Sequence, residues 1–293
     1  MNCLKIDYLQ SAHIPTVIDW ARKEGFSPGY GDIEIYRQTD RQGLWMAWLD
    51  NEPVGCIAGV RYNVHYGFIG MYIVVPKYRG LGYGKQLWKT ALNHLSDLTC
   101  IGLEAAQSRV LDYSGWGFEQ SSLTTRWCKV IDGSSSVLSE LQLPANMHVV
   151  EGLDVASEAV QIYDAKREPS PRPHFLADWL NHPSGTVLAI LDNQGFCHGF
   201  GRIRPCLMKQ DKGWRIGPLL ADTKEIGSFI IHHLCQNRYG YCLIDTPGLN
   251  RNAKALMENH EFHVISETMR MYRGVMPKVC LDDVFGLACL ELG

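Results

Sequence analysis

The sequence predicts a mixed α/β fold (α+β, with a mixed sheet) arranged as two tandem domains. The chain has 293 residues, which is about twice the length of an ordinary domain. Short apolar runs alternate with segments of helical periodicity, the pattern typical of α/β proteins. Related segments also recur at offsets of 142 to 147 residues, which indicates that one architecture occurs twice.

The repeat is clearest at two predicted hairpins. Met46–Asn51 is echoed by Leu188–Asn193, and in each an Asp-Asn turn follows apolar residues. Short side chains of this kind tolerate the tight backbone of hairpin loops. Further matches are Ile69-Gly70 with Ile216-Gly217, Gly117-Phe118 with Glu261-Phe262, and Arg126 with Arg270. We predict a first domain at 1–131, a Gly/Ser-containing linker at 132–146, and a second domain at 147–293.

Composition excludes several classes of protein. The 28 Lys and Arg residues stand against 31 Asp and Glu residues, for a net charge of -3, so no positive field favours nucleic acid or an anionic membrane. The longest uncharged stretch, 62–76, is too short and too polar to span a bilayer. The first residues show no basic segment followed by an apolar run of signal-peptide length, so export is not expected, and the ten cysteines never form a C-x-x-C pair. We expect a cytoplasmic chain with reduced thiols, no metal site, and no nucleic-acid or membrane partner.

One segment in the first copy predicts an anion site. An apolar strand ends at Pro76, which cannot donate a ladder hydrogen bond, and an amphipathic helix with Leu87, Ala91 and Leu92 on one face follows. Between them, glycines remove side chains where the chain turns and leave backbone N–H groups at the helix start free to bind a diphosphate. The loop residues are Arg79, Gly80, Leu81, Gly82, Tyr83, Gly84 and Lys85.

Two better-known phosphate loops fit this segment poorly. The nucleoside triphosphate loop needs glycine where Arg79 stands and Ser or Thr where Gln86 stands. The dinucleotide fingerprint needs G-x-G-x-x-G, whereas these glycines alternate.

The segment instead resembles the cofactor motif of the Gcn5-related N-acetyltransferase (GNAT) family, R/Q-x-x-G-x-G/A after a strand ending in V-x-P. Val74-Val75-Pro76 supplies the strand end, and Tyr113-Ser114-Gly115-Trp116-Gly117-Phe118 is similar to the family's Y-x-x-x-G-F. The resemblance covers about residues 1 to 130 and continues more loosely through the repeat. It implies two GNAT-like acyl-CoA N-acyltransferase domains and direct transfer of acetyl from acetyl-CoA to an amine.

The resemblance also implies residue roles. The backbone of Tyr72, Ile73 and Val74 should bond the pantetheine arm, and Arg79 through Lys85 should hold the diphosphate. Tyr113 matches a position near the departing sulfur and is the candidate acid. Reference pKa values near 10 for tyrosine and 8.5 for a thiol make full proton transfer uphill by about 2 kcal/mol, so a hydrogen bond to the thiolate is the expected contribution.

The sequence offers several candidates for the general base. An amine of pKa about 10.4 costs roughly 4.6 kcal/mol to neutralise at pH 7. Family members often carry a carboxylate early in the fourth strand, but Phe68 occupies that region here. Glu104, on the next predicted strand, is the preferred candidate, with His65, Glu34 and water as alternatives.

The second copy lacks the phosphate loop and carries Met257 where the first has Tyr113. A thioether cannot donate a proton, so we expect this copy not to catalyse transfer. It either shapes the acceptor pocket or stabilises the first domain. Its arginines at 167, 172, 202 and 204 are expected on a solvated face, and His232-His233 is not expected to bind metal.

Two functions remain open. The leading hypothesis is an acetyl-CoA-dependent N-acetyltransferase for a small-molecule or peptide amine, with the first domain active. The alternative is a non-catalytic acyl-CoA-binding or sensing protein. The sequence indicates neither the acceptor nor the oligomeric state.

Overall fold

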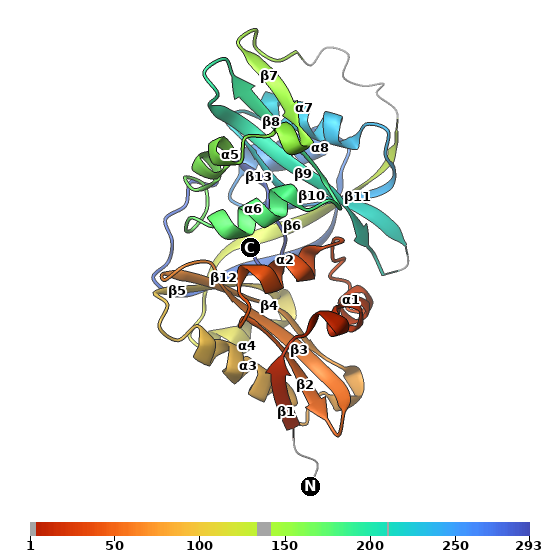
Figure 1. The fold of residues 1–293 in the computed structure, drawn as a ribbon, viewed down its shortest axis with the longest axis vertical. Helices are drawn as coiled ribbons and strands as arrows, with labels where there is room; N and C mark the ends of the chain where they lie inside the picture. Colours follow the sequence, from red (N-terminus) through yellow and green to blue (C-terminus); the bar gives the residue numbers. More distant parts are fainter. Residues whose placement is uncertain (1–3, 134–141, 210) are drawn as a thin grey trace.

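The computed structural model describes residues 4–133, 142–209 and 211–293. They form one 13-stranded mixed sheet that runs through both copies (Figure 1). The first copy contributes β1 (Leu4–Tyr8), β2 (Leu44–Leu49), β3 (Glu52–Arg61), β4 (Tyr66–Val74), β5 (Cys100–Ala106) and β6 (Glu119–Asp132). The second contributes β7 (Met147–Glu151), β8 (Thr186–Asp192), β9 (Cys197–Leu207), β10 (Lys212–Ala221), β11 (Tyr239–Pro247), β12 (His263–Gly274) and β13 (Val284–Gly286).

The helices follow the same order in both copies. Those of the first are α1 (Ile14–Lys23), α2 (Asp32–Thr39), α3 (Tyr83–His94) and α4 (Val110–Ser114). Those of the second are α5 (Ser157–Asp164), α6 (Pro173–Asn181), α7 (Lys224–Cys235) and α8 (Arg251–Asn259). The predicted mixed α/β class and the tandem repeat are thus confirmed.

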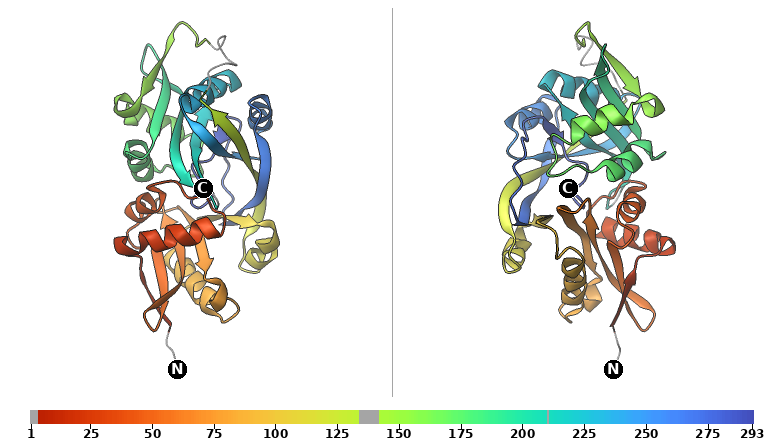
Figure 2. Two further views of the ribbon diagram at one scale, coloured as in Figure 1. Left: turned by 90° about the vertical axis from the view of Figure 1, so that its right-hand side faces the viewer. Right: turned by 60° about the vertical axis from the view of Figure 1, so that its left-hand side comes forward.

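The two copies exchange their long last strands. The strand order is β1-β2-β3-β4-β5-β12-β6-β11-β10-β9-β8-β7, so β12 of the second copy lies beside β5 of the first. In turn β6 of the first copy pairs with β11 of the second, from Asp132 opposite Tyr239 to Thr124 opposite Pro247. Figure 2 shows β6 and β12 together between the copies. Because of this exchange, residues of β12 belong spatially to the first copy.

Both predicted hairpins are present. Asp50 and Asn51, between β2 and β3, have φ of 48° and 69°, the left-handed conformation that two-residue hairpin turns require. In the second copy, the Asp192 carboxylate accepts backbone N–H bonds from Gln194 and Phe196 and closes the β8–β9 turn. The Asp-Asn pattern therefore predicts a turn at both sites for sound local reasons.

The apolar cores lie on both faces of the sheet. On one face of the first copy, α3 packs Leu87, Trp88 and Leu95 against the strands. On the other face a single cluster joins the copies, because it holds Ile33 and Tyr36 of α2 together with Phe175 and Trp179 of α6. The C-terminal residues Ala288, Cys289 and Leu292 belong to this shared cluster. The copies are therefore joined by a continuous core as well as by hydrogen bonds.

The arginines expected on a solvated face lie elsewhere. Arg172, Arg202 and Arg204 are buried, with exposed fractions of 4%, 0% and 0%. Arg172 pairs with Asp164 and Arg204 with Asp32. The expectation was wrong because the local sequence of an arginine does not show whether folding will bury it, as it does Arg204 beside the distant Asp32.

Arg202 has no carboxylate partner among the described residues. Its Nη2 contacts the Ser184 hydroxyl at 3.2 Å, while Nε and Nη1 have no hydrogen-bond partner. Burial and then the charge of Arg204 lower the pKa of Arg202 to about 9. The folded chain thus holds at pH 7 a buried cation that stacks on Trp179, 5.0 Å from the ring centroid, but has no carboxylate partner of its own among the described residues, which is destabilising.

We expect Arg202→Met to raise the free energy of unfolding at pH 7, by about 1 to 4 kcal/mol. The folded pKa is lowered, so the penalty is complete below about 9 and is relieved as pH rises through that value. In urea unfolding, the free energy of unfolding of Arg202→Met should therefore exceed that of wild type by more at pH 7 than at pH 10. Exposed Arg251→Met is the control, and a variant less stable than wild type would contradict the expectation.

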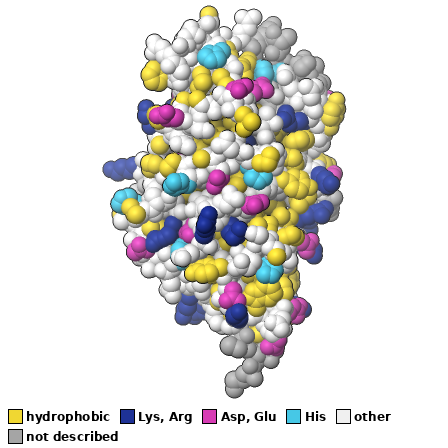
Figure 3. All heavy atoms as spheres, in the orientation of Figure 1, with side chains coloured by type: hydrophobic (Ala, Val, Ile, Leu, Met, Phe, Trp, Pro, Cys, Tyr) yellow, Lys and Arg dark blue, Asp and Glu magenta, His cyan; other side chains and the backbone are white. Residues whose placement is uncertain are grey.

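The predicted domain boundary falls at the β6–β7 connection. Here β6 ends at Asp132 and β7 begins at Met147, while residues 134–141 of the predicted linker lie outside the described residues. The boundary therefore stays a prediction. No helix in the described ranges is long and apolar enough to cross a membrane. Acidic and basic side chains are interspersed on the face shown in Figure 3.

Candidate active site

A wedge opens between β4 and β5. The two parallel strands pair only from Tyr66 opposite Cys100 to Ile69 opposite Leu103. Beyond this point β4 continues to Val74 and β5 to Ala106 without pairing to each other. The strands diverge there, so the backbone of residues 70–74 borders a cavity instead of a neighbouring strand.

The divergence coincides with an irregularity in β4. The register between β3 and β4 shifts between Cys56 and Ala58, and Met71 has a φ of 46°. A non-glycine residue in the left-handed region is uncommon and is typically maintained at functional sites. The irregularity lies where β4 stops pairing with β5.

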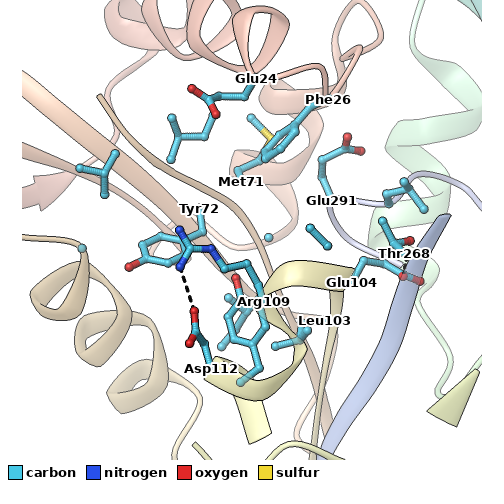
Figure 4. A pocket seen from close by; sticks show the side chains of 18 of the residues that line it. Glu24, Phe26, Met71, Tyr72, Leu103, Glu104, Arg109, Asp112, Thr268 and Glu291 are labelled. Atoms are coloured by element: carbon cyan, nitrogen blue, oxygen red, sulfur yellow. Dashed lines mark hydrogen bonds and ion pairs between the residues drawn. The ribbon is translucent and has the colours of Figure 1, made fainter. Parts of the chain in front are cut away.

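The cavity in the wedge has a volume of about 890 Å³. This is within the range of small-molecule sites. Figure 4 shows its lining drawn from several elements of both copies. The first copy supplies residues of β4, the loop before α3, β5 and α4, and the second supplies Ser266, Glu267 and Thr268 of β12 with Leu290 and Glu291 of the C-terminal segment.

The glycine loop forms the outer end of the site. Gly80 and Gly82 have φ of 77° and 84°, and Gly82 is the N-cap of α3 without a side-chain cap. Within the described residues, the N–H groups of residues 83–85 have no hydrogen-bond partner. Free N–H groups at a helix start bind anions well, so the loop fits a diphosphate.

The predicted loop residues divide into two groups. Arg79, Gly80, Gly84 and Lys85 line the cavity, whereas Leu81, Gly82 and Tyr83 do not border it. Arg79 donates from Nε to the Val74 carbonyl at 2.8 Å and pairs with Glu24. Its guanidinium thus fastens the loop to β4 and α1. Lys85 has no ion pair among the described residues, so its charge is free for a ligand.

Glycine at position 84 allows a close contact with β4. A Cβ there would lie 2.5 Å from the Tyr72 hydroxyl and 3.1 Å from Val74 Cγ2. A side chain at this position would therefore have to displace the end of the Tyr72 side chain. The predicted arm-binding residues Tyr72, Ile73 and Val74 all line the cavity.

Tyr113 lies on α4 and lines the same cavity. Its ring packs against Trp88, with ring centroids 5.0 Å apart. Burial raises the pKa of Tyr113 to about 12, with a further contribution from Tyr72. Its hydroxyl has no hydrogen-bond partner in the described part of the chain. The phenol is therefore neutral at pH 7 and has its proton available for a ligand.

Glu104 also lines the cavity, but its oxygens are occupied by the protein. Arg270 Nε donates to Oε1 at 2.6 Å, and the hydroxyls of Thr124 and Thr268 donate at 2.8 Å each. These contacts join β5 to β6 and β12. The other base candidates, His65 and Glu34, do not line the cavity.

The sequence analysis missed the cavity residues supplied by β6, β12 and the C-terminal segment. These are Arg126, Ser266, Glu267, Thr268, Leu290 and Glu291. In the sequence, Arg126 and Arg270 stand out only as corresponding positions of the two copies. No local motif marks the others, because the exchange of strands brings them to the site.

The second copy contains a corresponding wedge. There β10 and β11 pair from Gly213 opposite Tyr241 to Ile216 opposite Ile244 and then diverge. The opening is filled by the chain itself, because β13 pairs with β10 and the Leu287 N–H donates to the Asp245 carbonyl at 2.8 Å. A Cβ on Gly217 would lie 2.2 Å from the Leu287 carbonyl oxygen. The segment is therefore packed tightly into this wedge.

Comparison with known proteins agrees with this architecture. Residues 14–110 match a family model described as Acetyltransferase (GNAT) family, and residues 160–286 match one described as Acetyltransferase (GNAT) domain. Holothin acyltransferase of Pseudoalteromonas sp. (strain SANK 73390) is 27% identical over 279 residues, which cover 94% of this chain and 90% of that protein.

Solved structures show the same fold. A protein from Pyrococcus horikoshii, assigned as an acetyltransferase, has a TM-score of 0.79 at 20% identity and covers 99% of this chain and 96% of its own. A tandem GNAT protein from the clavulanic acid biosynthesis pathway has a TM-score of 0.65 at 12% identity, covering 94% and 100%. Each copy thus carries a GNAT domain, and the chain belongs to the GNAT family of acyltransferases.

Proposed function

We propose that the chain transfers an acetyl group from acetyl-CoA to the nitrogen of a small-molecule or peptide amine in a ternary complex, with the first copy active. The observation that carries this proposal is the continuous cavity, which extends from the free N–H groups of the glycine loop past Tyr113 to β12. The filled wedge of the second copy supports the assignment of activity to the first.

The residues of the first copy would have separate roles in binding acetyl-CoA and in catalysis. The loop N–H groups and Lys85 would hold the diphosphate, and the backbone of residues 72–74 would bond the pantetheine amides. Acetyl-CoA supplies the activated thioester. Tyr113 would stabilise the departing sulfur with a hydrogen bond, because its pKa of about 12 puts full transfer to a thiolate uphill by about 5 kcal/mol.

The predicted role of Glu104 as general base stays a prediction. Its three hydrogen bonds to Thr124, Thr268 and Arg270 support a different one, since they fix β12 against β5 and β6. We propose Glu104 as a positioning residue that holds the second copy's strand at the cavity.

Thiol release from acetyl-CoA in the presence of an amine panel tests the proposed activity. Holothin belongs in the panel because a relative is a holothin acyltransferase, together with benzylamine, tyramine and a peptide with a free N-terminus. Turnover above hydrolysis supports the enzyme. Tight binding of acetyl-CoA without turnover on any acceptor would favour the alternative, a non-catalytic acyl-CoA-binding or sensing protein.

The glycine loop provides a test of the cofactor site. We expect Gly82→Val to raise the Kd of CoA, measured by calorimetry, about 10- to 100-fold. A β-branched residue is strained at this φ, so the loop must shift and its N–H donors move away from the diphosphate. Gly195→Val is the matched control, since Gly195 has a φ of 85° and, like Gly82, open space around its Cα. Equal CoA affinity in both variants would contradict diphosphate binding at the loop.

A further inference from the structure

The C-terminal segment connects the two wedges. Residues 284–287 fill the wedge of the second copy, and the chain then crosses to the inner end of the first. There a Cβ on Gly70 would lie 1.7 Å from the Glu291 carbonyl oxygen and 3.0 Å from Glu291 Cα. The Tyr62 hydroxyl donates to the Leu292 carbonyl at 2.8 Å. The backbone of Glu291 is therefore held directly against β4, beside the bulge at Met71.

This placement puts a carboxylate at the inner end of the cavity. The Glu291 side chain is 5% exposed and lines the cavity. In Figure 4 it lies between Phe26 and the Glu104–Thr268 pair. Its Oε2 has no hydrogen-bond partner in the described residues, although Arg215 Nη1 is 3.3 Å away. A buried carboxylate oxygen in this condition requires a donor.

The neighbouring arginines are bound chiefly to another acid. Arg126 Nε and Nη2 donate to Asp245 at 2.7 and 3.0 Å, and Arg215 Nη2 donates to Asp245 at 2.7 Å. Arg215 Nη1 also donates to the Ser27 carbonyl at 3.2 Å. Glu291 therefore receives only the longer contacts of Arg215, at 3.5 Å on Oε1 and 3.3 Å on Oε2, and its buried Oε2 keeps the capacity to accept a hydrogen bond.

We propose that Glu291 binds the attacking nitrogen of the acceptor and takes its proton. This rests on the proposed function, and it makes the C-terminal segment a catalytic part of the first copy's site. An N–H or ammonium group is the ligand chemistry that satisfies an unpartnered carboxylate oxygen. The apolar residues nearby, Phe26, Met71 and Leu290, favour an acceptor whose amine is attached to an aromatic or aliphatic body.

The proton and electron balance is as follows. An ammonium N–H bond breaks and its proton forms an O–H bond on Glu291, which leaves the nitrogen lone pair free to form the N–C bond with the thioester carbon. The C–S bond breaks with its electron pair on sulfur, and the Tyr113 hydroxyl stabilises the departing thiolate with a hydrogen bond. The new amide nitrogen loses its excess proton, which protonates the thiolate through solvent, and Glu291 releases its proton to solvent.

Binding of benzylamine, measured by calorimetry with CoA present, tests the amine site independently of turnover. We expect Glu291→Gln to weaken benzylamine binding at least about tenfold, since a charge-assisted hydrogen bond is lost, while the Kd of CoA stays within about twofold. Glu258→Gln, on the exposed side of α8 and paired with Lys254, should change neither value. Unaltered benzylamine affinity in Glu291→Gln, or no benzylamine binding by wild type at millimolar concentration, would overturn the proposal.

Glu291→Asp keeps the charge opposite Arg215 but withdraws the carboxylate by one methylene. We expect a loss of benzylamine affinity between those of wild type and Glu291→Gln, and if Glu291→Gln does not fold, an Asp variant equal to wild type overturns the proposal. With the best acceptor of the amine panel, kcat/KM should fall about 10²- to 10³-fold in Glu291→Gln and be partly restored in Glu291→Asp. Benzylamine binding that depends on Glu291 without turnover of any amine would refute the proposed function alone.

Discussion

Replacing Tyr113 with phenylalanine is expected to lower kcat for acyl transfer about 10²- to 10³-fold, the usual cost of removing one hydrogen-bond donor to a developing anion. The ring would keep its packing against Trp88, so the fold and the Kd of CoA should be unchanged. Only the hydroxyl, which has no partner in the described protein, would be removed. Stopped-flow or steady-state thiol release with the best acceptor of the panel measures the effect.

The second copy provides the matched control for Tyr113. Met257 stands at the equivalent place on α8 and is fully buried in the second core. Met257→Leu conserves volume and should leave kcat unchanged. If Tyr113→Phe retained activity and Met257→Leu lost it, the active site would belong to the second copy. Because the pKa of Tyr113 is about 12, its ionisation should not appear in a pH–rate profile between pH 6 and about 9.

The strand–loop–helix unit at the outer end of the cavity could be predicted because its determinants are local. A strand stopped by Pro76, alternating glycines and an amphipathic helix specify a strand–loop–helix unit whose free N–H groups need no distant residue. Lys85 and Gly84 accordingly line the cavity as expected. The hairpin at Asp50-Asn51 was predictable for the same reason, since the turn geometry depends on adjacent residues alone.

The inner end of the cavity could not be predicted because its determinants are distant in sequence. Thr268 reaches the site only because β12 takes a place beside β5 that the first copy's own last strand would be expected to fill. Glu291 reaches it because the C-terminal segment crosses from one wedge to the other. The periodicity of β12 would be the same in either arrangement, so the pattern of apolar residues does not report which copy a strand joins.

The partners of the buried charges could not be predicted either, for the same reason. Glu104 was predicted to face the cleft and does line it, but its partner Arg270 comes from the other copy. Sequence reasoning can place a carboxylate on a strand, whereas the guanidinium that occupies it depends on the exchange of strands. The sequence therefore predicts two separate units, although ion pairs and an apolar cluster join the two copies.

Replacing Asp32 with alanine is expected to lower the free energy of unfolding by about 3 to 5 kcal/mol, because it leaves a buried arginine unpaired. Asp32 begins α2 in the first copy, and Arg204 of β9 in the second donates to it at 2.6 and 2.8 Å. Both side chains are 0% exposed. Arg204 also donates to the carbonyls of Gly217 and Ala288 at 3.2 Å each, so the pair fastens the C-terminal segment as well as the two copies.

The contribution of the Asp32–Arg204 pair to the free energy of unfolding should depend on pH, with a sign set by the pKa of Asp32. Burial alone would raise the pKa of Asp32, but the charge and hydrogen bonds of Arg204, with Arg215 and Arg202, outweigh it and lower the pKa below 3.8. The contribution to stability is therefore complete above the unfolded pKa and is lost as pH falls through the folded value. In urea unfolding at pH 7, the free energies of unfolding of wild type and Asp32→Ala should differ by the whole of the expected loss, about 3 to 5 kcal/mol. This difference should shrink below about pH 4.

Asp32→Leu combined with Arg204→Met separates the pair's own contribution from the cost of breaking it. Replacing both partners by apolar residues of similar size removes the unpaired charge, so the double variant should recover most of the stability lost in Asp32→Ala. Arg204 also stacks on Trp179, at 4.3 Å from the ring centroid, and methionine can keep that contact. A double variant as unstable as Asp32→Ala would instead mean that the carbonyls of Gly217 and Ala288 depend on the guanidinium, and that the pair acts mainly by holding the C-terminal segment.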